Sequence, residues 1–265
     1  MPDIKETKSP LDLIPQVARE HAAKLKAERD KPQRRIMIVG VSGSGKTYAA
    51  ATAPNPIYFD YDNQLNDPVV RNRLSAVFPM WNTAHIKDMY NVTGSPEERL
   101  KLLIKKYVAQ TLTCDHTIII DSASQFGDGV KDVLKEKFPD KGGDSSYRLW
   151  ETWAAIWRSL CGTLRDLPCN VIVTFHENEI RDETTNSLEK YGWMMQGKEF
   201  TPRIPQFFTD VVRQVHVVKE NKTSGTLENE EWLWQIKPTE KFPNGKSRCT
   251  TKAITIPANW QSIIK

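Results

Sequence analysis

The chain has 265 residues, of which 26% are charged, and its 37 Lys and Arg against 33 Asp and Glu give a formal net charge of +4. A chain of this length builds one large domain, or one domain with appendages, and buries a core without disulfides. The longest strictly apolar run has five residues, 153–157, whereas a membrane-spanning helix needs about 20. The N-terminus lacks the apolar core of a secretion signal, so we expect a cytoplasmic protein without membrane contact.

Residues 1–34 differ in pattern from the rest of the chain. Apolar side chains recur near helical spacing between positions 11 and 25, which predicts an amphipathic helix over 12–30 and a basic linker over 31–35. The amphipathic pattern does not say whose core such a helix faces. It either docks on its own domain or packs on a neighbouring subunit as an oligomerisation arm, while residues 35–265 form the main domain.

Short β-branched segments alternate with helical segments after residue 35. Strands are predicted over 36–39, 56–60, 117–121 and 170–175, and they are typical of parallel strands buried on both faces. Helices are predicted over 48–53, from a capping box at Ser95, and around Trp150, Trp153 and Trp157, whose shared face belongs in the core. Antiparallel strands are predicted over 211–218, 231–238 and 252–256. The pattern indicates an α/β protein with a mainly parallel central sheet, flanking helices and a β-rich C-terminal extension.

The strongest motif of the sequence is the glycine-rich segment 40–47, which directly follows the first predicted strand. Its glycines allow successive backbone amides to point at phosphate oxygens, and the N-terminus of the helix that follows adds partial positive charge. Lys46 is predicted to reach the β- and γ-phosphates and Thr47 to ligate Mg²⁺, so ATP and Mg²⁺ are the expected cofactors. The motif matches G-x-x-x-x-G-K-[ST] completely and consists of Gly40, Val41, Ser42, Gly43, Ser44, Gly45, Lys46 and Thr47.

Acidic residues end the strands that would neighbour this motif. Asp121 ends the 117–121 strand and is the expected carboxylate for Mg²⁺. Ser122 follows it, at a position where AAA+-type ATPases usually carry a water-activating glutamate, so the base must come from elsewhere. Asp60 and Asp62 stand two apart at the end of the 56–60 strand and point to one side of an extended chain. We predict Asp62 as the general base and Asp60 as the second acid, with two solvated turn acids as the alternative.

The cysteines and the net charge argue against a zinc site and against a DNA site spread over the whole surface. Cys114, Cys161, Cys169 and Cys249 show no C-x-x-C spacing, so we expect reduced, mostly buried thiols rather than zinc ligands. The net charge is too small to indicate nucleic acid by itself. Any DNA site has to be a local basic groove.

Together the motifs resemble those of RecA-like P-loop ATPases, over residues 35–250. IIIDSAS at 118–124 resembles the RecA-type Walker B strand, and YFDYD at 58–62 stands where that family carries an acid pair ending in a catalytic glutamate. VIVTFHENE at 171–179 places His176 at the position of a γ-phosphate sensor. The order of motifs is similar to that of small phage-encoded RecA-like proteins of the Sak type. The resemblance implies an ATPase stimulated by single-stranded DNA that acts in annealing or recombination in the host cytoplasm, assembles as a ring or filament, and has a single-strand binding protein as a further partner.

The resemblance also implies two DNA loops and a cation from the neighbouring subunit. The loops are expected within 125–147 and 177–200, although the second also carries acidic residues, among them Glu177, Glu179, Asp182, Glu183 and Glu189, and an ordinary solvated loop is the alternative. Lys237 and Arg248 are the expected trans-acting cations, with plain surface charge as the alternative. Cations and aromatic rings suit single strands. The candidate DNA-binding residues are Lys141, Arg148, Arg181, Lys190, Trp193 and Lys198.

Three other functions stay open. A small-molecule kinase needs an arginine-rich lid, and the 177–200 segment carries only Arg181. A GTPase needs a guanine-reading aspartate, whereas the N-K-x-D-like segment at 221–224 ends in Ser224. A nucleotide-gated interaction or accessory protein is compatible with every motif above. Stimulation of ATP hydrolysis by single-stranded DNA distinguishes the recombination function from all three.

Overall fold

The computed structural model of the chain describes residues 33–65, 67–109, 111–139, 144–197, 200–220 and 227–264. The helix predicted over 12–30 lies outside the described residues, as do Lys141, Lys198 and residues 31 and 32 of the predicted basic linker. The division of the chain into 1–34 and 35–265 therefore stays a prediction. The described helices and strands all belong to the compact unit Arg34–Lys265.

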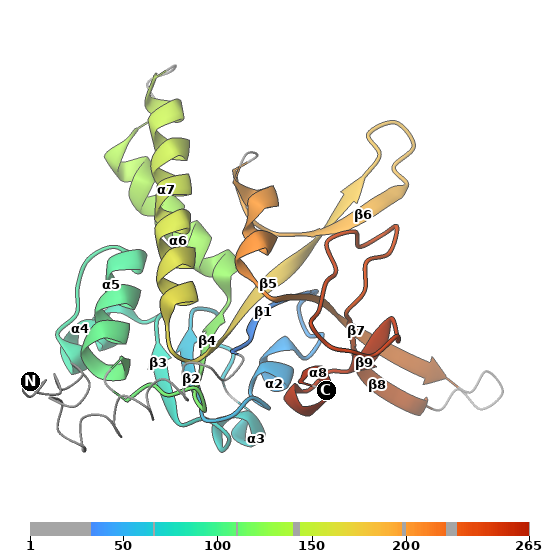
Figure 1. Ribbon diagram of the computed structural model, residues 1–265. Coiled ribbons are helices and arrows are strands. Elements are labelled where there is room, and N and C mark those ends of the chain that lie inside the picture. Colours follow the sequence, from blue (N-terminus) through green and yellow to red (C-terminus); the bar gives the residue numbers. More distant parts are fainter. Residues whose placement is uncertain are drawn as a thin grey trace, which may run out of the picture. The chain divides into compact units, whose positions relative to one another are not determined.

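The nine described strands form one mostly parallel sheet (Figure 1). Six neighbours run parallel, in the order β3 (Ala76–Pro79), β2 (Pro56–Asp60), β4 (Thr117–Asp121), β5 (Asn170–Arg181), β1 (Arg35–Gly40) and β7 (Asp210–Glu220). Antiparallel strands β8 (Leu227–Gln235) and β9 (Thr255–Pro257) continue the sheet beyond β7, and β6 (Leu188–Trp193) pairs antiparallel with the far end of β5. The predicted α/β class with a mainly parallel sheet is confirmed.

Helices cover both faces of the sheet, because its central strands are apolar on both sides. In β1, Ile36 and Ile38 belong to one cluster of buried side chains, and Met37 and Val39 belong to the other. The first cluster includes side chains of α2 (Lys46–Ala50), α3 (Pro68–Arg71) and α8 (Trp260–Ile263). The second and larger cluster includes side chains of α4 (Thr83–Tyr90), α5 (Pro96–Leu103), the π-helix η2 (Ile104–Val108), α6 (Ala123–Lys137), α7 (Asp144–Asp166) and the 3-10 helix η3 (Thr201–Phe207).

Local signals in the sequence account for the helices. The Ser95 hydroxyl accepts a hydrogen bond from the Glu98 amide at 3.3 Å, and the Glu98 carboxylate accepts one from the Ser95 amide at 2.8 Å, which completes the predicted capping box of α5. On α7, Trp153 and Trp157 are 1% and 2% exposed, so the tryptophan stripe is core. The four cysteines are all buried.

Both segments predicted as DNA loops instead have regular structure. α6 continues to Lys137 and α7 begins at Asp144, so the first segment is mostly helical. β5 does not stop at Phe175: it continues to Arg181 and forms with β6 a hairpin that extends beyond the rest of the sheet (Figure 1). A search for apolar runs misses such a hairpin. Two paired strands hydrogen-bond each other's backbone N–H and C=O groups, and this pairing requires no apolar face.

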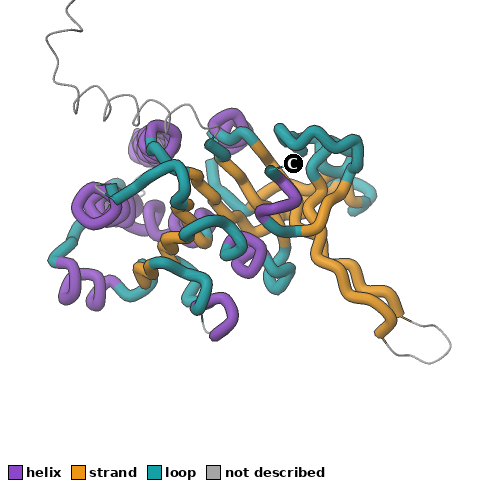
Figure 2. The backbone as a smooth tube through the Cα atoms, turned by 60° about the horizontal axis from the view of Figure 1, so that its bottom comes forward, coloured by secondary structure: helices purple, strands orange, loops and turns teal. Residues whose placement is uncertain are grey.

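β7 also differs from expectation. It was predicted within an antiparallel extension, and it does pair antiparallel with β8, but Asp210 to Arg213 run parallel to β1 and so belong to the central sheet. Beyond that stretch β7 and β8 continue as a two-stranded ribbon (Figure 2). Among the described residues, no helix combines the length and apolar character that a bilayer crossing requires.

Candidate active site

The motif of residues 40–47 forms a tight loop between β1 and α2. β1 is buried along its whole length and ends at Gly40, and α2 begins at Lys46. Gly43 and Gly45 have φ angles of 77° and 84°, a left-handed region in which a side chain is strained. A Cβ at Gly45 would also lie 2.7 Å from Cδ1 of Trp232. Glycine is therefore required where this backbone turns, as the motif predicts.

Lys46 lies folded against its own loop. Nζ donates to the carbonyl oxygens of Gly40 at 2.9 Å and Val41 at 2.8 Å, and the residue is 6% exposed. Burial lowers the pKa of Lys46, and the carboxylates of Asp121, Asp62 and Glu177 oppose that shift. Phosphate oxygens are stronger partners for an ammonium than neutral carbonyl groups, so this lysine is placed to exchange its contacts for a phosphate.

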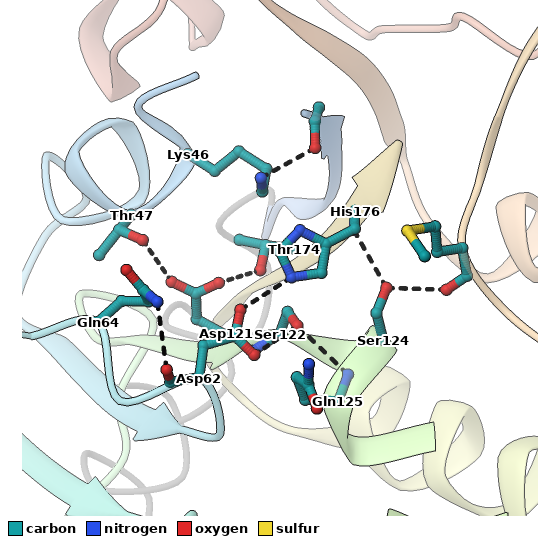
Figure 3. Close-up of polar contacts among 12 residues, drawn as sticks. Lys46, Thr47, Asp62, Gln64, Asp121, Ser122, Ser124, Gln125, Thr174 and His176 are labelled. Atoms are coloured by element: carbon teal, nitrogen blue, oxygen red, sulfur yellow. Dashed lines mark hydrogen bonds and ion pairs between the residues drawn. The ribbon is translucent and has the colours of Figure 1, made fainter. Parts of the chain in front are cut away.

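Asp121 accepts hydrogen bonds from three hydroxyl groups at the end of β4, and Figure 3 shows the two from Thr47 and Thr174. Thr47 Oγ1 donates to its Oδ2 at 2.6 Å, Tyr58 donates to the same oxygen, and Thr174 donates to Oδ1. Burial raises the pKa of Tyr58, and the charge of Asp121 raises it further, so the phenol keeps its proton and donates. Tyr58 and Thr174 were not among the predicted site residues. Their signal was a hydroxyl side chain near the end of each strand that flanks β4.

The donors in this corner of the site fit Mg²⁺. The metal takes hard oxygen ligands and usually keeps several waters, so it needs few protein groups. Thr47 and Asp121, already in contact, are the residues that would hold it. Within the described parts of the chain, no group of three or more His, Cys, Asp or Glu side chains is arranged to hold a metal ion, which leaves this pair as the metal-binding candidate.

Asp62 is the centre of a second network, in the turn after β2 (Figure 3). Its Oδ1 accepts from Ser122 Oγ at 2.8 Å and from the Ser122 amide at 3.3 Å, and its Oδ2 lies 3.0 Å from Nε2 of His176. Burial alone would raise the pKa of Asp62, but the hydrogen bonds from His176 and Ser122 outweigh burial and lower it. The Asp62 side chain is 8% exposed and the His176 side chain 23%, so the histidine is the member of the pair that faces solvent.

Asp60 does not join this network. It is 3% exposed, and its Oδ1 accepts from the backbone amides of Asp62 at 3.2 Å and Gln64 at 3.5 Å. Burial raises the pKa of Asp60 to about 6. β2 ends at Asp60, so the extended geometry that predicted two acids on one side does not reach Asp62. Asp60 instead shapes the turn that carries Asp62.

A buried ion pair lies beside the site. The Glu177 carboxylate accepts from Nε of Arg213 at 2.6 Å and from Nη2 at 3.0 Å, and the two side chains are 2% and 18% exposed. The guanidinium of Arg213 also lies 3.5 Å from the ring centroid of Tyr191 in β6. The pair therefore joins β5, β7 and the hairpin. Arg213 was not predicted, since a residue in mid-strand gives no sequence signal of a contact across two strands.

The described DNA-binding candidates lie on α7 and on the β5–β6 hairpin. Arg148 is exposed on α7 and Lys190 on β6, while Arg181 pairs with Glu179 at 2.6 Å. Trp193 is 7% exposed and packs in the larger core cluster, because it stands where β6 meets the body of the domain. Its ring is therefore not presented to DNA bases, contrary to the expectation.

The two candidate trans-acting cations lie near the C-terminal end of the chain. Lys237 is half-buried just after β8, and Arg248 is exposed, with its backbone amide donating to Asp210 Oδ1 at 2.8 Å. The charged end of Arg248 is thus on the surface of this unit. A role toward a neighbouring subunit stays a prediction for both residues.

Comparisons with known proteins give one family and a set of distant structures. A family model described as an AAA domain, AAA_24, matches residues 32–249. No curated protein matches the sequence. The chain is similar to the type III secretion ATPase EscN of enteropathogenic E. coli, at 14% identity over 69% of this chain and 42% of that chain, with a TM-score of 0.39. It is also similar to the flagellar accessory protein FlaH of Methanocaldococcus jannaschii, at 10% identity over 85% and 88% of the two chains, with a TM-score of 0.38. The chain spans less than half the length of EscN.

Proposed function

The chain belongs to the AAA domain family AAA_24, a family of P-loop ATPases, and from that membership we propose that it uses ATP hydrolysis to control its binding of single-stranded DNA. Its ATPase core is of the RecA-like type, and ATP and Mg²⁺ are its cofactors. The finer proposal rests on one observation, the unbroken course of β5 from the active site into the hairpin.

In this proposal, different residues of the site bind phosphate, hold the metal ion and activate the attacking water. The loop amides and Lys46 bind phosphate, while Thr47 and Asp121 would hold Mg²⁺, which would neutralise charge on the phosphate oxygens. His176, oriented by Asp62, polarises the attacking water. The histidine is the more exposed of the two side chains, and a lowered pKa makes the Asp62 carboxylate a weak base. In this proposal the proton-accepting role first predicted for Asp62 passes to its hydrogen-bonded partner.

β5 carries the state of the nucleotide to the hairpin. Within a few residues, Thr174 contacts Asp121, His176 contacts Asp62, and Glu177 contacts Arg213. The strand then continues to Arg181 without interruption. A phosphate contact that moves His176 therefore shifts the start of the hairpin, and hydrolysis reverses the shift.

Single-stranded DNA is the ligand that the resemblance to Sak-type proteins supports. The α6–α7 pair and the β5–β6 hairpin both project beyond the carboxyl ends of the strands (Figure 1). Arg148 is exposed on the first projection and Lys190 on the second. A strand of DNA held between the two projections would contact both cations.

The test is the affinity for a fluorescently labelled single-stranded oligonucleotide, measured by anisotropy with ADP and with a non-hydrolysable ATP analogue. We expect tighter binding in one nucleotide state, and linkage requires DNA to change ATP affinity by the same factor. Lys46→Ala should remove the difference between the states. Equal affinities in the two states, or no binding at low salt where the phosphate contribution is largest, would refute the DNA proposal.

A second candidate follows from the charge of the hairpin. Its acidic residues Glu179, Asp182, Glu183 and Glu189 outnumber Arg181 and Lys190, which opposes phosphate contacts at that place and favours a basic protein partner. The protein would then be a nucleotide-gated interaction protein, with the same coupling through β5. Nucleotide-dependent hydrogen exchange at 178–192 without any DNA binding selects this candidate.

A further inference from the structure

An exposed tryptophan lies directly against the phosphate-binding loop. Trp232 belongs to β8, and its ring edge approaches Gly45 so closely that an added Cβ would lie 2.7 Å from Cδ1 and 3.0 Å from Nε1. Gly45 immediately precedes Lys46, the phosphate-binding lysine. Trp232 is nevertheless 41% exposed. A large aromatic side chain at the loop thus keeps much of its surface in water, where it gains little from burial.

The ring is held in place from its other side. Trp232 and His216 are a directly opposed pair in the β7–β8 register, and their rings are stacked, with centroids 4.8 Å apart and planes 10° from parallel. Nε2 of His216 in turn lies 2.7 Å from a carboxylate oxygen of Glu230. One face of the indole is therefore covered by His216, and the exposed surface belongs to the rest of the ring. Covered on one face and fixed at one edge, the ring is preorganised.

We propose that Trp232, supported by His216, is the platform on which the base of the bound nucleotide stacks. The proposal rests on the ATPase function, and it assigns the nucleoside end of the site, which neither the motif nor the Asp121 and Asp62 networks reach. Phosphates bound by the loop amides leave the nucleoside to project outward from the loop, toward exposed groups that touch the loop. Stacking of a base on an aromatic side chain strengthens binding roughly 10- to 100-fold per base. It recognises a flat ring and not particular exocyclic groups, so the platform favours purine nucleotides without strong discrimination between them.

Tyr48 is the competing ring near the loop. It follows Thr47 and is 45% exposed. Its ring and its hydroxyl are both engaged by Arg73, with the guanidinium 4.6 Å from the ring centroid and a hydrogen bond of 3.0 Å to the hydroxyl oxygen. The three atoms nearest to a Cβ added at Gly45 all belong to Trp232. The geometry therefore favours Trp232 and provides Tyr48→Ala as the comparison.

The test separates the base from the phosphates. Dissociation constants for ATP and for inorganic tripolyphosphate, both with Mg²⁺, are measured by calorimetry for the wild type, Trp232→Ala, Trp232→Phe and Tyr48→Ala. We expect Trp232→Ala to weaken ATP binding 10- to 100-fold while tripolyphosphate binding changes less than about 2-fold. Trp232→Phe should keep most of the ATP affinity, and Tyr48→Ala should resemble the wild type.

Two outcomes would overturn the platform. These are an unchanged ATP affinity in Trp232→Ala and a selective loss of ATP affinity in Tyr48→Ala alone. Tripolyphosphate binding also reports an intact loop, so a misfolded variant is recognised by losing both ligands, and the conservative Trp232→Phe then decides by its ratio of ATP to tripolyphosphate affinity. No DNA is present in this experiment, so a failure of the platform leaves the DNA proposal standing. A wild type that binds neither ligand would refute the ATPase site itself.

Discussion

Nε2 of His176 lies 3.0 Å from Oδ2 of Asp62, although 114 positions separate the two residues in the chain. The contact arises because β2 and β5 are the two neighbours of β4. Asp62 follows the end of β2, His176 lies in β5 beside Gly40, and Ser122 at the end of β4 donates to Asp62 from between them. Asp62 and His176 therefore form one hydrogen-bonded unit next to the loop of residues 40–47, and in the proposed mechanism they act together.

This unit predicts a non-additive loss of activity. His176→Ala and Asp62→Asn should each lower the turnover number by about 10²- to 10⁴-fold, because each removes the same oriented base. The Kd for ATP should stay within a few-fold of the wild-type value. The double variant should lose little more than the more impaired single variant, as groups that act together do. Steady-state turnover and calorimetric Kd values of the three variants test this, and fully multiplicative losses would show independent roles.

Thr174→Val tests the hydroxyl groups around Asp121. The substitution keeps the shape of the side chain but removes a buried donor from a carboxylate that is 2% exposed. We expect the free energy of unfolding to fall by about 1–3 kcal/mol, measured by urea denaturation without Mg²⁺. Thr117→Val in β4 is the matched control. Thr117 is 0% exposed and its hydroxyl has no hydrogen-bond partner among the described residues, so its loss should be neutral or stabilising. Equal effects of the two substitutions would contradict the account.

The sequence predicts those parts of the site that depend on neighbouring residues in the chain. The phosphate-binding loop and the carboxylate at the end of β4 follow from short motifs with a fixed local geometry. Tyr58, Thr174 and Arg213 could not be predicted, because their contacts depend on which strands are neighbours and on the register between them. Trp193 was misplaced for a related reason. An aromatic residue in a polar segment suggests an exposed ring, whereas the hairpin returns it to the core.

The strands of the fold also divide into those with a local sequence signal and those without one. Four strands were found from their apolar residues, since burial on both faces leaves a strong pattern in a short segment. The hairpin of β5 and β6 was not found, because pairing of backbone groups requires no apolar residues. β3 was also missed; it is a four-residue strand at the edge of the sheet, too short for a pattern.

Asp60→Asn tests the pH dependence that burial creates. Burial raises the pKa of Asp60 from 3.8 to about 6, so the folded state binds the proton more tightly than the unfolded state. The contribution of this group to stability is therefore most favourable below about pH 4 and is lost as the pH rises through about 6. An asparagine oxygen still accepts from the amides of Asp62 and Gln64. We expect the variant to be more stable than the wild type at pH 7 by roughly 1–2 kcal/mol, allowing for solvent screening, and to lose this advantage near pH 4. Denaturant unfolding between pH 4 and 7, without Mg²⁺, measures the difference, and a difference independent of pH would contradict the assignment.

Arg213→Ala tests whether the ion pair with Glu177 holds the hairpin to the active site. Removing the guanidinium leaves a carboxylate that is 2% exposed without its charged partner and takes away the contact with Tyr191. Loss of one partner of a buried pair is costly, because the other charge stays desolvated. We expect backbone amides over 178–192 to exchange with deuterium at least 10-fold faster, while those of the central strand β4 keep their wild-type rates.

Arg181→Ala is the matched control, since Arg181 pairs with Glu179 on the same hairpin with both side chains nearly half exposed, at 45% and 46%. An exposed pair of this kind contributes little to stability, so its loss should leave exchange over 178–192 almost unchanged. A second measurement separates anchoring from signalling. In the wild type, the exchange rates of the hairpin should differ between ADP and a non-hydrolysable ATP analogue, and in Arg213→Ala this difference should disappear although ATP is still bound. A hairpin that loosens in Arg213→Ala but still responds to the nucleotide would show that the pair only anchors it and that the signal passes through His176 alone.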